Sequence, residues 1–516
     1  MQYNKVYPPK IYLLVVIALI GNMYLAPATH AQNPTTTLKP IKVDDNQLIP
    51  LDVLMKPLST QGYTRPAEPL PPTLIAAINR PATVQVLANF TGNLQYQQLL
   101  IYTDNLRQAV AQIETSALIG NLPNNNADKL MALLTLIQQN PHAFLTPDNS
   151  ITQEQINIGA TGSGLIITPQ GHLVTNAHVV ATDEASLAQK LLSTGFFNRV
   201  GELAKYLQST YPQPNGLSEP ATQLLLQIME TFYTSRGYFK LANITGRYRV
   251  LTGYTLQNPG YHIEANLLAI GQPIPGKDVA ILKLQTTQNN WPTISFGPDR
   301  ELRSGDEMYV LGYPGVVNNN EVLDQNVMRQ PSFTEGKMSA RQKTKGGWEA
   351  IQITAAVGRG NSGGPVFNKY GEVIGILTFG SQDASQGGAL VQGFNFIVPN
   401  SIIHQFIHQA GLTPTLSNSA TTLRQALQWM ADKKYKKAAA ALNEIKSSFA
   451  QFPYLNEELN DATTKAASEK NTLMDYWDNM DTKTQIMLGL AAVMVVGGGA
   501  GKLFTYGVHL LFFFFV

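Results

Sequence analysis

The sequence contains no cysteine, and only 14% of its 516 residues are charged. The missing cysteines exclude disulfide bonds, thiolate metal sites, iron–sulfur clusters and a cysteine nucleophile. The 37 basic and 35 acidic residues give a formal charge of +2. We expect no nucleic-acid partner, because neutralising phosphates needs a basic excess or a basic stripe. Any catalysis therefore depends on serine, histidine, carboxylates or a cofactor.

The longest apolar stretches lie at the two ends of the chain. Residues 11–20 (IYLLVVIALI) follow a basic start and precede small residues, so residues 1–31 are predicted to be a signal peptide. A retained anchor or a buried strand is the alternative. Residues 486–516 are strongly apolar and predict a transmembrane segment, with a buried helical hairpin as the alternative. Together the ends predict an exported protein that a C-terminal helix anchors in a membrane.

Between the ends, the sequence divides into four regions with different patterns. Residues 32–90 contain several prolines and no sustained periodicity, which is typical of an extended spacer. Residues 91–150 show helical spacing and predict an N-terminal helical segment. Residues 151–412 contain many short β-rich runs, which favour antiparallel barrels or sandwiches, and a helical insertion is predicted at 183–238. Residues 413–480 predict a C-terminal helical hairpin.

Three segments of the β-rich region contain the residue types of nucleophilic catalysis. They are Thr175–Val180 (TNAHVV), Gly276–Leu282 (GKDVAIL) and Gly358–Pro365 (GRGNSGGP). A serine hydroxyl needs a neighbouring imidazole as its base, and the imidazole needs a buried carboxylate that fixes its tautomer. Glycines beside the serine let the backbone approach a substrate closely. The order His, Asp, Ser along the chain is that of the chymotrypsin class.

The β-rich region resembles the trypsin-like serine proteases of the bacterial HtrA/Deg family. The resemblance rests on GSGLIITPQGHLVTNAHVV, GKDVAILKL, IQITAAVGRGNSGGPVFNKYGEVIGILTF and QGFNFIVPNSIIHQFI. It covers less than half of the chain. The implied fold is mainly β, a double six-stranded antiparallel β-barrel with a helical insertion and flanking helices. We expect the family's PDZ domain to be missing, because residues 413–485 show helical spacing where it would follow.

The resemblance implies a role for individual residues. Ser362 is the expected nucleophile, His178 the general base and Asp278 the carboxylate that orients this base. The backbone N–H groups of Gly360 and Ser362 are expected to form the oxyanion hole. The implied activity is that of a serine-type endopeptidase, which cleaves peptide bonds in proteins or peptides through an acyl-enzyme, without a metal or other cofactor.

The expected specificity pocket is apolar. Ala356 stands six residues before Ser362, where trypsin has its specificity aspartate. Val357, Leu377 and Phe379 are the other expected wall residues. We therefore predict cleavage after small or medium aliphatic residues rather than after lysine or arginine.

The insertion at 183–238 begins just after the histidine segment, and its position is left open. It is either a lid or docking element over the cleft or a distal addition to the barrel. The expected location is the bacterial periplasm or cell envelope, with a role in protein quality control or processing. The alternatives are a protease-fold binding or chaperone-like protein with little turnover, and a protease that is inactive until the helices move. The sequence leaves the oligomeric state open.

Overall fold

The computed structural model describes residues 40–43, 50, 53, 56–180, 184–235, 237–253, 262–315, 330–383, 389–468, 480–481 and 483–488. The predicted signal peptide lies outside the described residues, as does nearly all of the predicted transmembrane segment. Within the described ranges, no helix is long and apolar enough to cross a bilayer. The membrane anchor therefore stays a prediction.

The first of two β-barrels closes from six strands in the order β6-β5-β2-β3-β4-β7, with β7 pairing back onto β6. A short strand, β1 (Ile41–Lys42), adds to β6 in parallel. Alternate residues such as Val84 and Val86 point into the apolar interior with Leu173 and Leu282. The six strands are β2 (Thr83–Ile101), β3 (Leu145–Ile166), β4 (His172–Thr175), β5 (Phe239–Leu251), β6 (Ile263–Ile270) and β7 (Ala280–Leu284).

The second barrel closes in the order β10-β13-β12-β11-β8-β9. Helix α11 (Asn400–Gln409) follows it and buries Phe406 in a cluster shared with both barrels. The predicted fold class, a double six-stranded antiparallel barrel with flanking helices, is confirmed. The strands are β8 (Glu307–Gly312), β9 (Ser332–Lys343), β10 (Glu349–Ile353), β11 (Pro365–Phe367), β12 (Val373–Asp383) and β13 (Ala389–Pro399).

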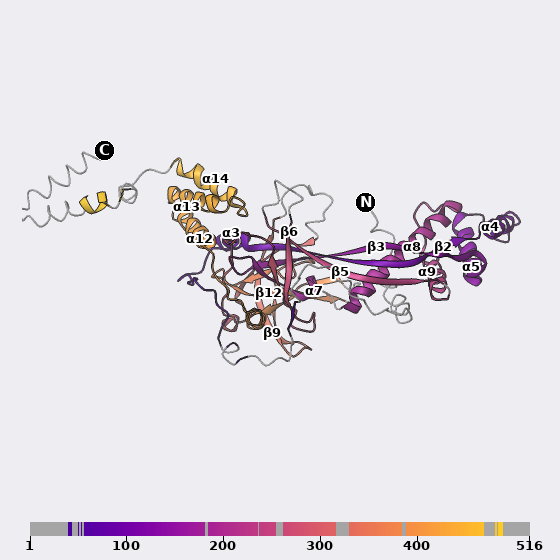
Figure 1. Cartoon of the computed structure of the whole chain (residues 1–516), viewed down its shortest axis with the longest axis horizontal. Helices are drawn as coiled ribbons and strands as arrows, with labels where there is room; N and C mark the ends of the chain where they lie inside the picture. Colours follow the sequence, from indigo (N-terminus) through magenta and orange to yellow (C-terminus); the bar gives the residue numbers. More distant parts are fainter. Residues whose placement is uncertain are drawn as a thin grey trace, which may run out of the picture.

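Strands β2, β3 and β5 continue far beyond the first barrel as a three-stranded ribbon (Figure 1). Helices gather on the outer part of this ribbon, and we call the assembly of ribbon and helices the helical lobe. The face of β2 that fills the barrel with Val84 and Val86 fills the lobe with Phe90 and Leu94. The lobe's helices are α4 (Thr103–Leu118), α5 (Asn126–Gln139), α6 (Pro141–Phe144), α8 (Glu184–Thr210) and α9 (Glu219–Ser235).

The secondary structure differs from the expectation before residue 150. The expected spacer at 32–90 contains helix α3 (Pro72–Asn79) and a short 3₁₀ turn, η1 (Arg80–Ala82), and it ends inside β2. The expected helical segment at 91–150 begins in β2 and ends in β3, so its helices connect two barrel strands. Helices α8 and α9, in contrast, lie within the predicted insertion at 183–238. The division of the chain into domains stays a prediction.

Three helices follow the barrels where a helical hairpin is expected: α12 (Asn418–Ala431), α13 (Tyr435–Ser448) and α14 (Leu455–Ala466). They pack on the first barrel, where the rings of Trp291 and Phe449 meet edge to face at 5.1 Å. The Arg80 guanidinium lies 4.3 Å from the Tyr454 ring, and the Tyr454 hydroxyl lies 3.4 Å from that of Tyr313. The C-terminal helices are thus part of the barrels' packing. The missing PDZ domain stays a prediction.

His172 on β4 is expected to make the protein less stable in acid. Its Nδ1 atom lies 2.7 Å from Thr168 Oγ1. Burial, and then the charge of Lys283 on the paired strand, lower the pKa of His172 from 6.5 to about 4. The unfolded chain therefore binds this proton at a higher pH than the folded chain. The contribution of the neutral His172 ring to the free energy of unfolding is complete above pH 6.5, and it is lost as the pH falls towards 4.

Denaturant unfolding on either side of pH 6.5 checks this prediction. The free energy of unfolding should fall towards the acidic side, and a His172→Gln variant should lose less of it over the same range. An equal loss in the two proteins would contradict the assignment to His172.

Candidate active site

His178 and Asp278 meet at one end of a pair of neighbouring strands in the first barrel, where β4 ends and β7 begins. His178 lies in α7 (Ala177–Val180), directly after β4, and Asp278 lies just before β7. The Nδ1 atom of His178 is 2.8 Å from Asp278 Oδ2, and the backbone N–H of His178 donates to Oδ1 at 2.9 Å. The Asp278 side chain is 0% exposed and the histidine ring 35%. The ring thus faces solvent while its carboxylate partner is buried.

Hydrogen bonds from both barrels hold Asp278 in this buried position. Thr378 Oγ1, on β12 of the second barrel, donates to Oδ2 at 2.5 Å. Asn176 Nδ2 donates to the Asp278 carbonyl at 2.8 Å. Asp278 has a φ of +46°, a left-handed conformation that Asp and Asn adopt more readily than most residues. The carboxylate itself accepts from the backbone N–H and Nδ1 of His178 and from the Thr378 hydroxyl. These three donors offset the cost of removing its charge from water.

Ser362 lies between β10 and β11, and Thr378 brings it to the His–Asp pair. The Ser362 hydroxyl donates to the Thr378 carbonyl at 3.2 Å, while the Thr378 side chain holds Asp278. The structure therefore gathers the three expected catalytic residues around one residue of β12. The sequence analysis missed Thr378, although it stands between two expected pocket residues, Leu377 and Phe379. The pairing of β12 with β13 is irregular between Leu377 and Phe379, so the alternation of a regular strand does not reveal which way Thr378 faces.

Ser163 on β3 connects the first barrel to residues 354–364 of the second barrel, which contain Ser362 and which we call the serine loop. Its backbone N–H donates to the Ser362 carbonyl at 2.7 Å, and its hydroxyl donates to the Gly360 carbonyl at 2.8 Å. The same hydroxyl accepts from the N–H of Tyr313 at 2.9 Å, and Thr175 Oγ1 donates to the Ser163 carbonyl at 2.7 Å. The N–H and the hydroxyl of Ser163 thus hold the loop, while its carbonyl is bound by Thr175 of the same barrel. Ser163 lies in the GSGLII stretch that carries the family resemblance, but the sequence analysis gave it no role.

The peptide bond between Arg359 and Gly360 has a fixed orientation. The Arg359 carbonyl accepts from the N–H of Gly315 at 2.6 Å. Because the two polar groups of a trans peptide point in opposite directions, the N–H of Gly360 is directed away from Gly315. Gly360 has a φ of +99°, and a Cβ there would lie 2.4 Å from the Tyr313 carbonyl oxygen. Only glycine fits this position.

The expected specificity residues lie at the edge of the second barrel's core. Leu377 is buried, and Val357 packs against the same cluster. Phe379 stacks on Phe396 of β13 with ring centroids 4.7 Å apart. Ala356 is exposed. Leu377 and Val357 are thus brought together, while the role of all four residues stays a prediction.

A cavity of about 530 Å³ lies beside His178, between the ribbon and helix α8. Phe90, Ile158 and Ala160 form its ribbon side, and Leu187 and Phe197 are among the residues of α8 that face it. The insertion therefore lines a cavity beside His178, and its role as a lid or docking element stays a prediction.

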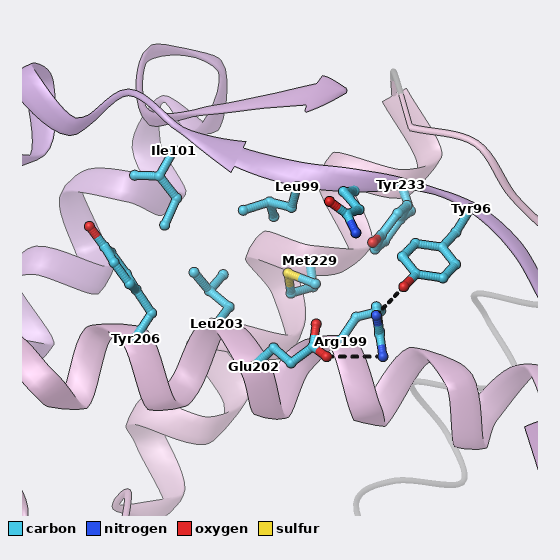
Figure 2. Close-up of a pocket in the computed structure, with 10 residues that line it drawn as sticks. Tyr96, Leu99, Ile101, Arg199, Glu202, Leu203, Tyr206, Met229 and Tyr233 are labelled. Atoms are coloured by element: carbon cyan, nitrogen blue, oxygen red, sulfur yellow. Dashed lines mark hydrogen bonds and ion pairs between the residues drawn. The ribbon is translucent and has the colours of Figure 1, made fainter. Parts of the chain in front are cut away.

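A second cavity, of about 330 Å³, lies within the helical lobe. Figure 2 shows Arg199 beside Glu202 and Tyr96 on its wall. The guanidinium pairs with Glu202 at 3.0 Å and with Glu154 at 2.9 Å, and it lies 4.6 Å from the Tyr96 ring. Two carboxylates match this cation, so we assign no ligand to the cavity. In the part of the chain that the structure describes, no three His, Asp or Glu side chains gather as a metal site.

Part of the chain is similar in sequence to known serine proteases. Residues 242–376 match the family described as a trypsin-like peptidase domain. This range includes Asp278 and Ser362 and begins after the helical insertion, so His178 lies before it. Relatives include a "Probable periplasmic serine endoprotease DegP-like" of Brucella suis, 33% identical over 153 residues, which are 29% of this chain and 26% of that protein. "Serine protease HTRA2, mitochondrial" of Bos taurus is 29% identical over 142 residues, 26% of each protein.

Solved structures similar to this chain include "HtrA-type protease AlgW with decapeptide", with a TM-score of 0.32 and 17% identity over 66% of this chain and 69% of that one. A serine endoprotease from Yersinia pestis has a TM-score of 0.30 and 17% identity over 66% and 67% of the two chains. The chain spans about a quarter of the length of the curated relatives described above. Over part of its length, which includes residues 242–376, this chain is similar to trypsin-like peptidases, and its relatives include serine proteases of the HtrA/DegP kind.

Proposed function

We propose that this chain is a serine-type endopeptidase that hydrolyses peptide bonds through an acyl-enzyme. The observation that carries the proposal is the gathering of Ser362, His178 and the buried Asp278 around Thr378. The match of residues 242–376 to a trypsin-like peptidase domain supports it.

Proton transfer in this site follows from the His–Asp contact. Because Nδ1 of His178 donates to Asp278, the neutral ring has an unprotonated Nε2. Rotation of the Ser362 hydroxyl from the Thr378 carbonyl towards Nε2 starts the reaction. The serine oxygen bonds to the substrate carbonyl carbon, and its proton passes to Nε2. The imidazolium then gives this proton to the departing amine, and the C–N bond breaks. Water repeats the sequence on the acyl-enzyme.

The serine loop is well placed to bind the negative oxygen that forms on the substrate. We assign the oxyanion hole to the N–H groups of Gly360 and Ser362. The Arg359 carbonyl accepts from the N–H of Gly315 and the Asn361 carbonyl from the N–H of Gly364, so the orientations of the two peptide groups that carry these donors are set before substrate binds. Preset donors of this kind lower the barrier because they need no reorganisation during the reaction.

We propose that the enzyme acts in the cell envelope, in protein quality control or processing. The predicted signal peptide and transmembrane segment support export and anchoring, and a relative is described as periplasmic. The proposed substrates are proteins or peptides with an aliphatic residue before the scissile bond, since Leu377, Val357 and Phe379 offer apolar walls.

A fluorophosphonate probe tests the activity in membrane and soluble fractions. We expect the full-length protein to be labelled covalently and the Ser362→Ala variant to remain unlabelled, because only an activated serine attacks the phosphorus atom. Among peptidyl phosphonates, one with valine at the first position should react faster than one with lysine.

The control is the circular dichroism spectrum, which should be the same for both proteins. A folded wild-type protein that takes no label would contradict the proposal and would favour the binding or chaperone-like alternative.

A further inference from the structure

Strand β3 runs from the serine loop into the helical lobe with one edge unpaired. On one side, β2 pairs with it from Leu145 to Leu165. On the other side, β4 pairs only with Leu165 and Ile166. Among the described residues, no strand covers this second edge between Leu145 and Gly164. An unpaired edge can accept a further strand through its backbone groups.

The free edge starts at the proposed nucleophile. The N–H of Ser163 points away from β2 to the Ser362 carbonyl, and its C=O points to Thr175 Oγ1. In an antiparallel ladder, every second residue presents both backbone groups to the same side. The register between β2 and β3 is regular here, so Thr161 and Gly159 also present their N–H and C=O on the free edge.

Helix α8 forms the second wall of a groove along this part of β3. The cavity of about 530 Å³ is lined by Ile158, Gly159 and Ala160 and also by His178. On the α8 side, Leu187 and Phe197 are apolar, and further residues of the helix that line it are Ser186, Gln189, Lys190, Ser193 and Thr194.

The rim of the groove carries a positive charge. Lys190 is exposed, and no carboxylate of the described residues pairs with it. Opposite charges across such a rim favour one partner over another by modest factors. A partner with an acidic residue at this point is therefore favoured.

The chemistry of the proposed reaction identifies the occupant. In that reaction His178 protonates the departing amine, so the part of the substrate that follows the scissile bond begins at His178. The predicted pocket for the preceding residue lies on the other side, at Leu377 and Phe379 of the second barrel. A substrate that continues past His178 enters the cavity between β3 and α8.

We propose that the substrate segment on the C-terminal side of the scissile bond binds as an added strand on the edge of β3, with alternate side chains beneath α8. The inserted helix thereby selects substrates that are extended, apolar and acidic on that side. This inference depends on the proposed endopeptidase activity, and the test below separates the two.

Two fluorogenic peptides with the same residues before the scissile bond test the groove. One ends just after the bond, and the other continues with an extended segment that includes leucine and glutamate. For the wild type we expect kcat/KM to be about 10-fold higher for the longer peptide, because the added strand contributes several backbone hydrogen bonds. A Ser193→Trp variant, which fills the groove, should lose this preference and retain its rate on the short peptide.

Asn198→Trp is the matched control, since Asn198 is exposed on the same helix and does not line the cavity. It should keep the wild-type preference. Equal kcat/KM values for the two peptides in a wild type that takes the fluorophosphonate label would overturn the inference while leaving the endopeptidase activity intact. Absence of labelling would instead reject the proposed activity.

Lys190→Glu tests the charge at the rim. Exchange of the substrate's glutamate for lysine should lower kcat/KM for the wild type by up to about five-fold and raise it for this variant. The same response in both proteins would show that Lys190 does not face the substrate.

Discussion

Asp278→Asn is expected to lower kcat by about 10⁴-fold with little change in stability. The backbone N–H of His178 donates to Oδ1 of Asp278, so the amide oxygen of the asparagine must take this place. The amide nitrogen then faces Nδ1 of His178, and the ring has to accept a hydrogen bond there. This forces the proton onto Nε2, where the ring can no longer accept the proton of Ser362. Asparagine tolerates the left-handed backbone of this position, so the fold is retained.

Steady-state kinetics and thermal unfolding of the variant measure both parts of this expectation. Thr378→Val is the matched control, because it removes one hydrogen bond to Asp278 and keeps the histidine tautomer. We expect this variant to lose about 10-fold or less in kcat, in line with the loss of a single hydrogen bond. An Asp278→Asn protein with more than about a tenth of the wild-type kcat would show that the contact does not set the tautomer.

Gly363→Ala is expected to lower kcat/KM by at least about 100-fold through displacement of the serine loop. Gly363 has a φ of +83°, and an added Cβ would lie 2.2 Å from the Ser163 carbonyl oxygen and 2.4 Å from Thr175 Oγ1. Both neighbours belong to the first barrel, while Ser362 is directly attached to the second. The clash therefore moves the nucleophile away from His178, and a shift of about 1 Å is enough for this loss.

Gly347→Ala is the control for Gly363→Ala, because it introduces the same backbone strain without a steric clash. Gly347 lies between β9 and β10 with a φ of +84°, and an added Cβ there has no atom within 4 Å. Both variants should lose about 1 kcal/mol of stability from the left-handed backbone, but only Gly363→Ala should lose activity. Equal kinetics of the two variants would contradict the assigned role of the contact with Ser163.

The residues of the site differ in how far the sequence revealed them. His178, Asp278 and Ser362 were predictable because each lies in a short segment whose neighbouring residues have a recognisable pattern. Ser163 and Thr378 were not, because they act across the boundary between the barrels. Their contacts exist only once β3 and β12 are placed beside the serine loop.

The long strands were misjudged for a related reason. Residues 86–96 alternate between buried and partly buried positions, as a strand does, yet the sequence predicted spacer and helix there. Ala88 and Phe90 become buried only because α8 and α9, from residues 184–235, cover the ribbon. Such a strand depends on apolar partners from a distant part of the chain, and local periodicity does not supply them.

The C-terminal helices also determine where this protein can be cut for study. A recombinant fragment that stops after α11 would keep all three proposed catalytic residues and both barrels. It would nevertheless uncover the apolar surface around Trp291 and remove Tyr454 from the hydroxyl of Tyr313, whose N–H binds Ser163. A crystallisation or screening fragment should therefore extend through α14, because the residues that support the catalytic site continue further along the chain than the catalytic residues themselves.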